Sequence, residues 1–207
     1  MPSPLLPLPF ARHPGLLQGP RTALVLIDFQ QAFTAPGSPT FLPDALPALH
    51  HACRLLRSAR TAGIPIAFSR HAYLKPPPPG GMGSWWTRFI LDSDPRSNLA
   101  PQVEPRPGEL AFRKTHYSAL LRTPLRRWLR EHQVRSLVLC GVMTHVCVDS
   151  TAREAFSLGY DVVIAADACA SKSIELHQAS LLCLSHAIAS VATTAQLVRR
   201  FALENKP

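Results

Sequence analysis

The sequence predicts an α/β protein, a three-layer α/β/α domain around a six-stranded, mostly parallel, Rossmann-like sheet. Short runs dominated by apolar residues, such as 23–27 and 136–141, have the length and composition of strands buried on both faces. These runs alternate with longer segments of helical periodicity, which is the order of a parallel sheet covered by helices. The 207 residues suffice for one such domain with a substantial core.

The expected elements follow one another along most of the chain. The strands cover residues 23–27, 64–69, 110–113, 136–141, 161–166 and 190–192. The helices cover residues 44–61, 124–132, 144–158 and 174–188, and a last one begins at residue 194. Pro124 suits the first turn of its helix, and Gly63 and Gly159 suit positions just past a helix end.

Apolar residues at helical spacing predict which faces of two helices are buried. In the first helix the expected buried stripe is Leu46, Leu49, Cys53 and Leu56. In the helix over 144–158 the residues expected to face inward are Val148, Ala152, Ala155 and Phe156.

Two segments depart from this regular order. Residues 1–20 contain prolines at positions 2, 4, 7, 9, 14 and 20, which exclude the helical apolar segment of a secretion signal. We therefore expect an extended Pro-rich arm over 1–20, the folded domain over 21–207 and a cytoplasmic location. Residues 71–109 are unusually long for a loop and contain Trp85 and Trp86, so we expect a lid, a binding loop or a disordered insert.

Composition excludes several classes of protein. No apolar run approaches the roughly 18 residues that cross a bilayer, so no membrane partner is expected. The five cysteines are odd in number and form no C-x-x-C pair, which is typical of free thiols in a reducing compartment. The formal charge of +9 comes from scattered residues without a nucleic-acid-binding motif, so we expect no nucleic-acid partner. This charge leaves open an anionic substrate or a simple preference for arginine.

Three reactive residues follow the ends of predicted strands. Asp28 comes after the first strand, Lys114 after the third, and Cys147 shortly after the fourth. Taken singly, these residues are compatible with a helix cap, a surface charge and a core thiol. Because ligands of open parallel sheets bind beyond the carboxyl ends of the strands, all three are expected on the same rim.

The sequence around these residues resembles a known family. Residues 23–30 (ALVLIDFQ), 112–119 (FRKTHYSA) and 141–153 (GVMTHVCVDSTAR) resemble motifs of the isochorismatase-like hydrolases, as do residues 161–171 (DVVIAADACAS). That group includes nicotinamidases, N-carbamoylsarcosine amidases and ureidoacrylate hydrolases. The motifs occur in the family order, and the resemblance runs from about residue 20 to residue 200.

The resemblance implies a cysteine hydrolase that needs no cofactor. It implies a catalytic triad of Asp28, Lys114 and Cys147, a cis peptide between Val142 and Met143, and an oxyanion hole made by the backbone N–H groups of Met143 and Cys147. It also implies a homodimer or homotetramer acting on a small molecule.

The chemistry of the residues agrees with these roles. A free thiol is mostly protonated at neutral pH, whereas a helix N-terminus and a nearby ammonium favour the thiolate. Our hypothesis is that Asp28 takes the proton from Cys147 and the thiolate attacks a carbonyl carbon. Asp28 then protonates the leaving nitrogen and activates the water that hydrolyses the thioester.

Departures from the family pattern narrow the activity. Isochorismatases proper cleave a vinyl ether and usually have glycine in place of the cysteine, so this activity is the alternative. A further alternative is a non-catalytic member with a redox-active thiol. Nicotinamidases bind a metal through an Asp-x-His segment, whereas the end of the second strand here reads Ser69-Arg70-His71. We therefore expect no metal, which makes a nicotinamidase less favoured.

The sequence also offers candidates for the substrate pocket. Phe33 lies five residues after Asp28, where the family often places an aromatic residue. The further candidates for substrate binding are Gln30, Trp85, Tyr117 and His145. Each of these side chains also suits ordinary packing or loop formation.

Overall fold

The structure is a computed structural model that describes residues 21–204, so the predicted arm over 1–20 lies outside the described residues. Within that range a single sheet of six strands is parallel throughout, in the order β3-β2-β1-β4-β5-β6. The strands are β1 (Thr22–Ile27), β2 (Ile66–His71), β3 (Leu110–Lys114), β4 (Ser136–Val142), β5 (Asp161–Ala170) and β6 (Ser190–Ala192). The predicted fold class is confirmed.

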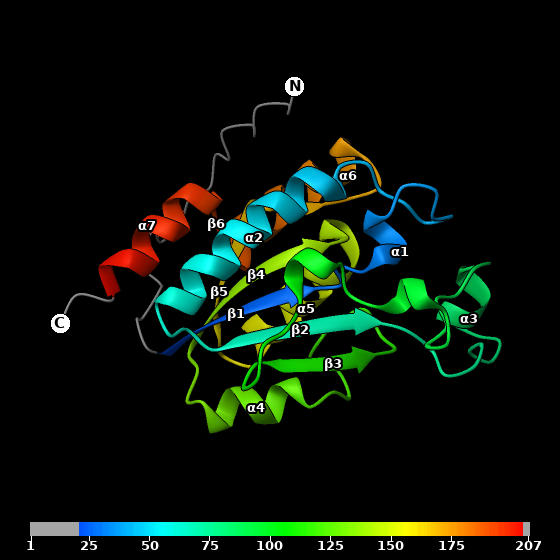
Figure 1. Ribbon diagram of the computed structural model, residues 1–207, viewed down its shortest axis with the longest axis horizontal. Helices are drawn as coiled ribbons and strands as arrows, with labels where there is room; N and C mark the ends of the chain where they lie inside the picture. The colour runs from blue at the N-terminus through cyan, green and yellow to red at the C-terminus, as the bar shows by residue number, and fades with distance from the viewer. Residues whose placement is uncertain (1–20, 205–207) are drawn as a thin grey trace.

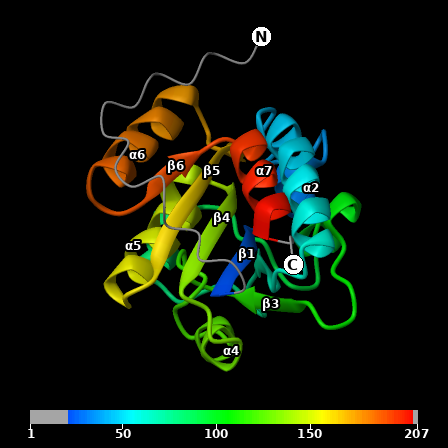
Figure 2. The same cartoon turned by 90° about the vertical axis from the view of Figure 1, so that its left-hand side faces the viewer.

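Helices cover both faces of the sheet (Figures 1 and 2). One layer holds α2 (Ala45–Thr61) and α7 (Thr194–Glu204), which pack on each other and on β5. The other layer holds α4 (Leu125–Glu131), α5 (Asp149–Ser157) and α6 (Ile174–Ala187). The short helices α1 (Gln31–Thr34) and α3 (Met82–Trp85) follow β1 and β2, beyond the strands' carboxyl ends (Figure 1). Among the described residues, we find no helix with the length and apolar character needed to cross a bilayer.

The central strands are apolar because helices cover them on both sides. Every residue of β1 and of β4 is buried. The strand β5 extends to Ala170, four residues past its predicted end, because Asp167 has partners there. Its carboxylate accepts hydrogen bonds from the backbone N–H and the hydroxyl of Thr194 at 2.7 and 2.8 Å, at the start of α7. An acid in a strand is unusual, and only these tertiary contacts explain it.

The predicted buried faces of two helices need correction. In α2, Leu46 is 41% exposed. The buried face of this helix consists instead of alanines together with Leu49, Leu55 and Leu56. In α5, Phe156 is 48% exposed, whereas Ala152 and Ala155 are buried. Alanines contribute to the buried side of both helices, which a ranking by hydrophobicity alone overlooks.

Residues 71–109 are ordered and attached to the body of the domain. The backbone N–H of Tyr73 donates to the carbonyl of Ile90 at 2.9 Å, and Gln30 forms an isolated β-bridge with Leu99. The segment also contains α3 and two short 3-10 turns, Pro95–Ser97 and Pro101–Val103. Of the three expectations for this segment, the disordered insert is therefore wrong.

A close backbone approach at the end of β4 yields a test of the sheet's packing. Gly141 has φ +138°, and a Cβ there would lie 2.0 Å from the carbonyl oxygen of Ile27 in β1. Gly141→Ala is expected to lower the free energy of unfolding by about 3 kcal/mol or more, measured by urea unfolding followed by circular dichroism. Gly159→Ala is the control, because that glycine has φ +86° but open space around it. Its cost should be only about 1–2 kcal/mol, and equal losses in the two variants would contradict the steric argument.

Candidate active site

The reversal of strand order between β1 and β4 places three residues of interest together. The chain runs outward from β1 in both directions of the sheet, and crevices form at such switch points beyond the strands' carboxyl ends. Asp28 directly follows β1, and Lys114 is the last residue of β3. Cys147 lies in a π-helical turn, Thr144–Val148, that connects β4 to α5.

The ammonium of Lys114 joins the three side chains. Its Nζ lies 2.7 Å from Oδ2 of Asp28 and donates a hydrogen bond to Sγ of Cys147 at 3.2 Å. A further hydrogen bond, of 3.0 Å, goes to the carbonyl oxygen of His116. One ion pair and two hydrogen bonds thus satisfy the ammonium of Lys114, which is only 2% exposed.

Asp28 is held from its other side by β2. The hydroxyl of Ser69 donates to Oδ1 of Asp28 at 2.7 Å, and the backbone N–H of Asp28 donates to the carbonyl of Ser69 at 3.0 Å. The backbone of Asp28 has φ +55°, which turns the chain sharply as it leaves the strand. One carboxylate oxygen thus faces Ser69 and the other faces Lys114.

The turn that carries Cys147 is fixed by side chains from α6 and the loop before it. The Val142–Met143 peptide bond is cis and directly precedes this turn. Thr144 and His177 share a hydrogen bond of 2.8 Å between Oγ1 and Nδ1, and Ser171 Oγ lies 2.9 Å from Nδ1 of His145. Ser180 donates to the carbonyl of Thr144 at 3.3 Å.

The surroundings keep the Cys147 thiol protonated at rest. Burial and the carboxylate of Asp28 raise the pKa of Cys147 to about 12, although Lys114 acts in the opposite direction. Burial alone would lower the pKa of Lys114, but the nearby Asp28 and Cys147 together raise it. Lys114 thus acts on the thiol in the direction expected from the sequence, but burial outweighs it, so the proton must be removed by a base.

A cavity of about 340 Å³ opens above these residues. Asp28 and Cys147 are among its lining residues, with Val142 and Met143 beside them. Its apolar and aromatic walls come mainly from two regions, α1 with the residues after it and the segment over 71–109. From these regions the lining includes Phe33, Leu42, Tyr73, Met82, Trp86, Phe89 and Ile90.

The predicted substrate-binding residues divide into two groups. Phe33, Tyr117 and His145 line the cavity, whereas Gln30 and Trp85 do not. Gln30 is fully buried, and its amide bonds to the backbone of His71 and Ser97, so it joins the loops behind the site.

The second tryptophan of the pair takes the place expected for the first. Trp85 is 77% exposed at the end of α3. Trp86 lines the cavity, and its indole N–H donates to the hydroxyl of Tyr117 at 2.7 Å. Sequence alone does not decide which of two adjacent tryptophans turns inward, because the choice depends on the tertiary partner.

His71 also belongs to the site, although it was not among the candidates for substrate binding. It ends β2 directly beside Lys114 in the register and lines the cavity. Burial, with the adjacent Lys114, lowers its pKa to about 4, so the imidazole is neutral at pH 7. Its position at the end of a predicted strand already allowed it to approach the pocket. Among the described residues, no group of three His, Cys, Asp or Glu side chains is arranged to hold a metal ion.

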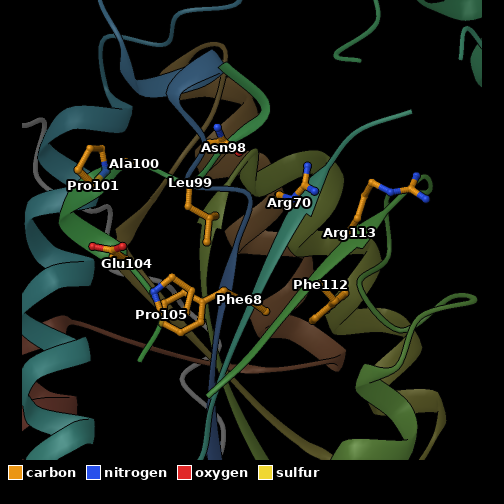
Figure 3. A pocket seen from close by; sticks show the side chains of 11 residues that line it. Phe68, Arg70, Asn98, Leu99, Ala100, Pro101, Glu104, Pro105, Phe112 and Arg113 are labelled. Carbon is orange, nitrogen blue, oxygen red and sulfur yellow. The ribbon is translucent and has the colours of Figure 1, made fainter. Parts of the chain in front are cut away.

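A second hollow, of about 450 Å³, lies beside β2 and β3. It is lined by Phe68 and Phe112 from these strands and by Leu99, Pro101 and Pro105 from the segment before β3 (Figure 3). No cysteine, serine or lysine lines it. Its two arginines, Arg70 and Arg113, both lie near the carboxylate of Asp92, at 2.6 and 3.9 Å. Of these two cavities, only the first is lined by Asp28 and Cys147.

Comparison with known protein families shows to which family the chain belongs. The family model described as Isochorismatase domain matches residues 22–196. The chain belongs to the isochorismatase family.

Other members of the family are similar over most of their length. A plant protein named Nicotinamidase 3, from Arabidopsis thaliana, is 33% identical over 181 residues, covering 86% of this chain and 87% of that protein. A ureidoacrylate amidohydrolase of Methylobacterium radiotolerans is 32% identical and covers 84% of this chain and 77% of its own. The crystal structure of a cysteine hydrolase from Pseudomonas syringae pv. phaseolicola superposes with a TM-score of 0.85 at 23% identity, covering 99% of this chain and all of that one, which shows the shared fold.

The raised pKa of Cys147 predicts the ionisation behaviour of this family member. The ultraviolet absorbance of a thiolate, read as the difference between wild type and Cys147→Ala, should be absent at pH 7 and still absent near the ordinary thiol pKa of about 8.5. In Asp28→Asn it should appear at lower pH than in wild type, because the carboxylate that helps to raise the pKa is gone.

Asp161→Asn serves as the control for that measurement. Asp161 begins β5, at the opposite end of the strands from Cys147, and its replacement should leave the titration unchanged. A thiolate signal in the wild-type protein at pH 7 would contradict the assignment of a protonated resting thiol.

Proposed function

We propose that this enzyme is a cysteine-dependent hydrolase that splits the C–N bond of a small amide, carbamoyl or ureido compound through a thioester. The observation that carries the proposal is the cluster on the cavity floor, where one ammonium contacts both a carboxylate and a thiol, at 2.7 and 3.2 Å. Such a nucleophile beside a base, with a third group orienting both, is the arrangement that covalent catalysis requires.

The first half of the reaction forms the thioester. Asp28 accepts the proton of Cys147 as the sulfur attacks the carbonyl carbon, and the carbonyl oxygen becomes an oxyanion. The backbone N–H groups of Met143 and Cys147 are proposed to stabilise that oxyanion, an effect of roughly 3 kcal/mol per donor elsewhere. Asp28 then gives its proton to the nitrogen, the C–N bond breaks, and ammonia or an amine leaves.

The second half restores the enzyme. Asp28 takes a proton from a water molecule, whose oxygen attacks the thioester carbon. The C–S bond breaks, the carboxylic acid product departs, and the sulfur of Cys147 regains a proton from Asp28. Lys114 stays protonated throughout, and its ammonium stabilises whichever of its two neighbours carries the negative charge.

The names of the relatives support the class of reaction. Nicotinamidase 3 and the ureidoacrylate amidohydrolase are both named for C–N bond cleavage. The relatives also include a maleamate amidohydrolase of Pseudomonas putida, 28% identical over 181 residues. A vinyl-ether-cleaving activity is disfavoured because Cys147 occupies the position where that group usually has glycine.

A purely redox role for Cys147 is also disfavoured. Redox-sensing thiols are exposed and have lowered pKa values, because the thiolate is the form that oxidants attack. Cys147 is only 8% exposed, and burial with Asp28 raises its pKa to about 12. A thiol with a raised pKa needs a neighbouring base to form the thiolate. Asp28 is that base in the proposed hydrolase, whereas a redox sensor relies on a lowered pKa instead.

The location and the assembly of the enzyme are proposed from its cysteines and from its resemblance to the family. All five cysteines are free, which suits the reducing cytoplasm. We propose a homodimer or homotetramer without a nucleic-acid partner, by resemblance to the family. Sedimentation velocity of the full chain tests this state, and a monomer at micromolar concentration would contradict it.

Ammonia release across a panel of small amide, carbamoyl and ureido compounds tests the function. Cys147→Ala is expected to lose about a thousandfold or more in kcat on any compound that the wild type hydrolyses, because the thioester cannot form.

Cys169→Ala is the matched control for the loss of a thiol. Cys169 is also buried, and burial raises its pKa to about 12, but it belongs to β5 and does not line the cavity. This variant should keep its turnover. If Cys147→Ala kept full turnover, or if both variants lost it equally, the proposed mechanism would be abandoned.

A further inference from the structure

Two cations on the cavity wall have no partner among residues 21–204. Arg88 and Lys172 both line the cavity and are exposed, and neither forms an ion pair or hydrogen bond within residues 21–204. Other exposed cations of the described surface, such as Lys75 and Arg126, are unpaired as well, so what distinguishes Arg88 and Lys172 is their place on the cavity wall. Arg88 and Lys172 therefore add uncompensated positive charge to the space that receives the substrate.

The backbone on either side of each cation is well anchored. Arg88 lies between Trp86, whose indole bonds to Tyr117, and Ile90, whose carbonyl accepts from Tyr73 at 2.9 Å. Lys172 is preceded by Ser171, which bonds to His145, and followed by Ser173, the N-cap of α6. The two charges are thus carried on fixed segments, from opposite parts of the chain, that meet at this cavity.

No negative charge in the cavity lining offsets them. Asp28 is the only carboxylate among the lining residues, and Lys114 already neutralises it at 2.7 Å. The two lining histidines add no negative charge, and burial lowers the pKa of both His71 and His145. At neutral pH the cavity therefore has a net positive charge, which attracts an anion and repels a cation.

We propose that the substrate is an anionic half-amide or ureido acid, whose carboxylate binds Arg88 and Lys172 while its C–N bond lies at Cys147. This inference rests on the proposed function and specifies its substrate class. The body of such a molecule would lie against Phe33, Trp86 and Phe89, which line the same cavity. Complementary charge at a binding site sets specificity and association rate, so neutral amides of the same shape should be poorer substrates.

Matched pairs of compounds test the charge preference. Each half-amide of a dicarboxylic acid, aliphatic or aromatic, is compared with its own methyl ester, which keeps the scissile amide and removes the charge. For the acids, kcat/KM should exceed that for the esters by about tenfold or more. The advantage of the acids should also shrink as ionic strength rises, because salt screens exposed charges.

Variants then assign the preference to the two cations. In Arg88→Gln/Lys172→Gln, the ratio of kcat/KM between acid and ester should fall to near unity, mainly through a higher KM for the acid. Lys75→Gln/Arg126→Gln is the control, because it removes the same charge from exposed residues that do not line the cavity. The control should keep the wild-type ratio, and since the readout is a ratio within one variant, partial misfolding does not imitate the effect.

Binding measurements separate this inference from the proposed function. Calorimetric titration of Cys147→Ala with each acid and ester measures affinity without turnover. Two results together would support the inference even if the wild type hydrolysed no amide. The acids should bind more tightly than the esters, and this difference should be lost in the triple variant that also carries Arg88→Gln and Lys172→Gln. Turnover of amides with equal kcat/KM for acids and esters would overturn the inference and leave the proposed function standing. The inference also fails if the preference for acids survives in Arg88→Gln/Lys172→Gln.

Discussion

Lys114 and Asp28 form an ion pair with almost no exposure to solvent, and the rest of the site is arranged around it. Removing one partner of a buried ion pair costs about 3–5 kcal/mol in other proteins, because a bare charge is left in the interior. Here three strands contribute to the pair, since Asp28 follows β1, Ser69 of β2 holds its carboxylate, and Lys114 ends β3. The carboxyl ends of the strands must therefore keep their register if the site is to stay intact.

The burial of the site also explains why the thiol of Cys147 keeps its proton. A thiolate in this position would lack water, and the neighbouring carboxylate would repel it, so Cys147 keeps its proton and its pKa rises to about 12. In the proposed reaction Asp28 accepts this proton as the sulfur attacks the substrate. Lys114 contacts both Asp28 and Cys147. Its positive charge is balanced by the carboxylate before the proton transfer and by the thiolate after it.

The walls of the cavity depend on parts of the chain without a regular pattern. Residues 71–109 carry no strand or helix periodicity, yet this segment supplies Trp86, Arg88 and Phe89 to the cavity. The direction of each side chain there follows from contacts such as the hydrogen bond between Trp86 and Tyr117, which join residues far apart in sequence. In the proposed reaction this segment contacts the substrate, whereas the strands of the sheet position Asp28 and Lys114.

The sequence by itself determined the fold class, the number and order of the strands, and the convergence of Asp28, Lys114 and Cys147 at one rim. These predictions use the apolar composition of buried strands and the geometry of parallel sheets. Both follow from local sequence or chain topology, so a single sequence is enough to apply them. Only the tertiary structure decided that Trp86 rather than Trp85 faces the cavity, that Leu46 is exposed, that Gln30 lies behind the site and that the thiol is protonated. These outcomes depend on which distant groups surround a side chain and how much water they exclude, and neither quantity is written in local sequence.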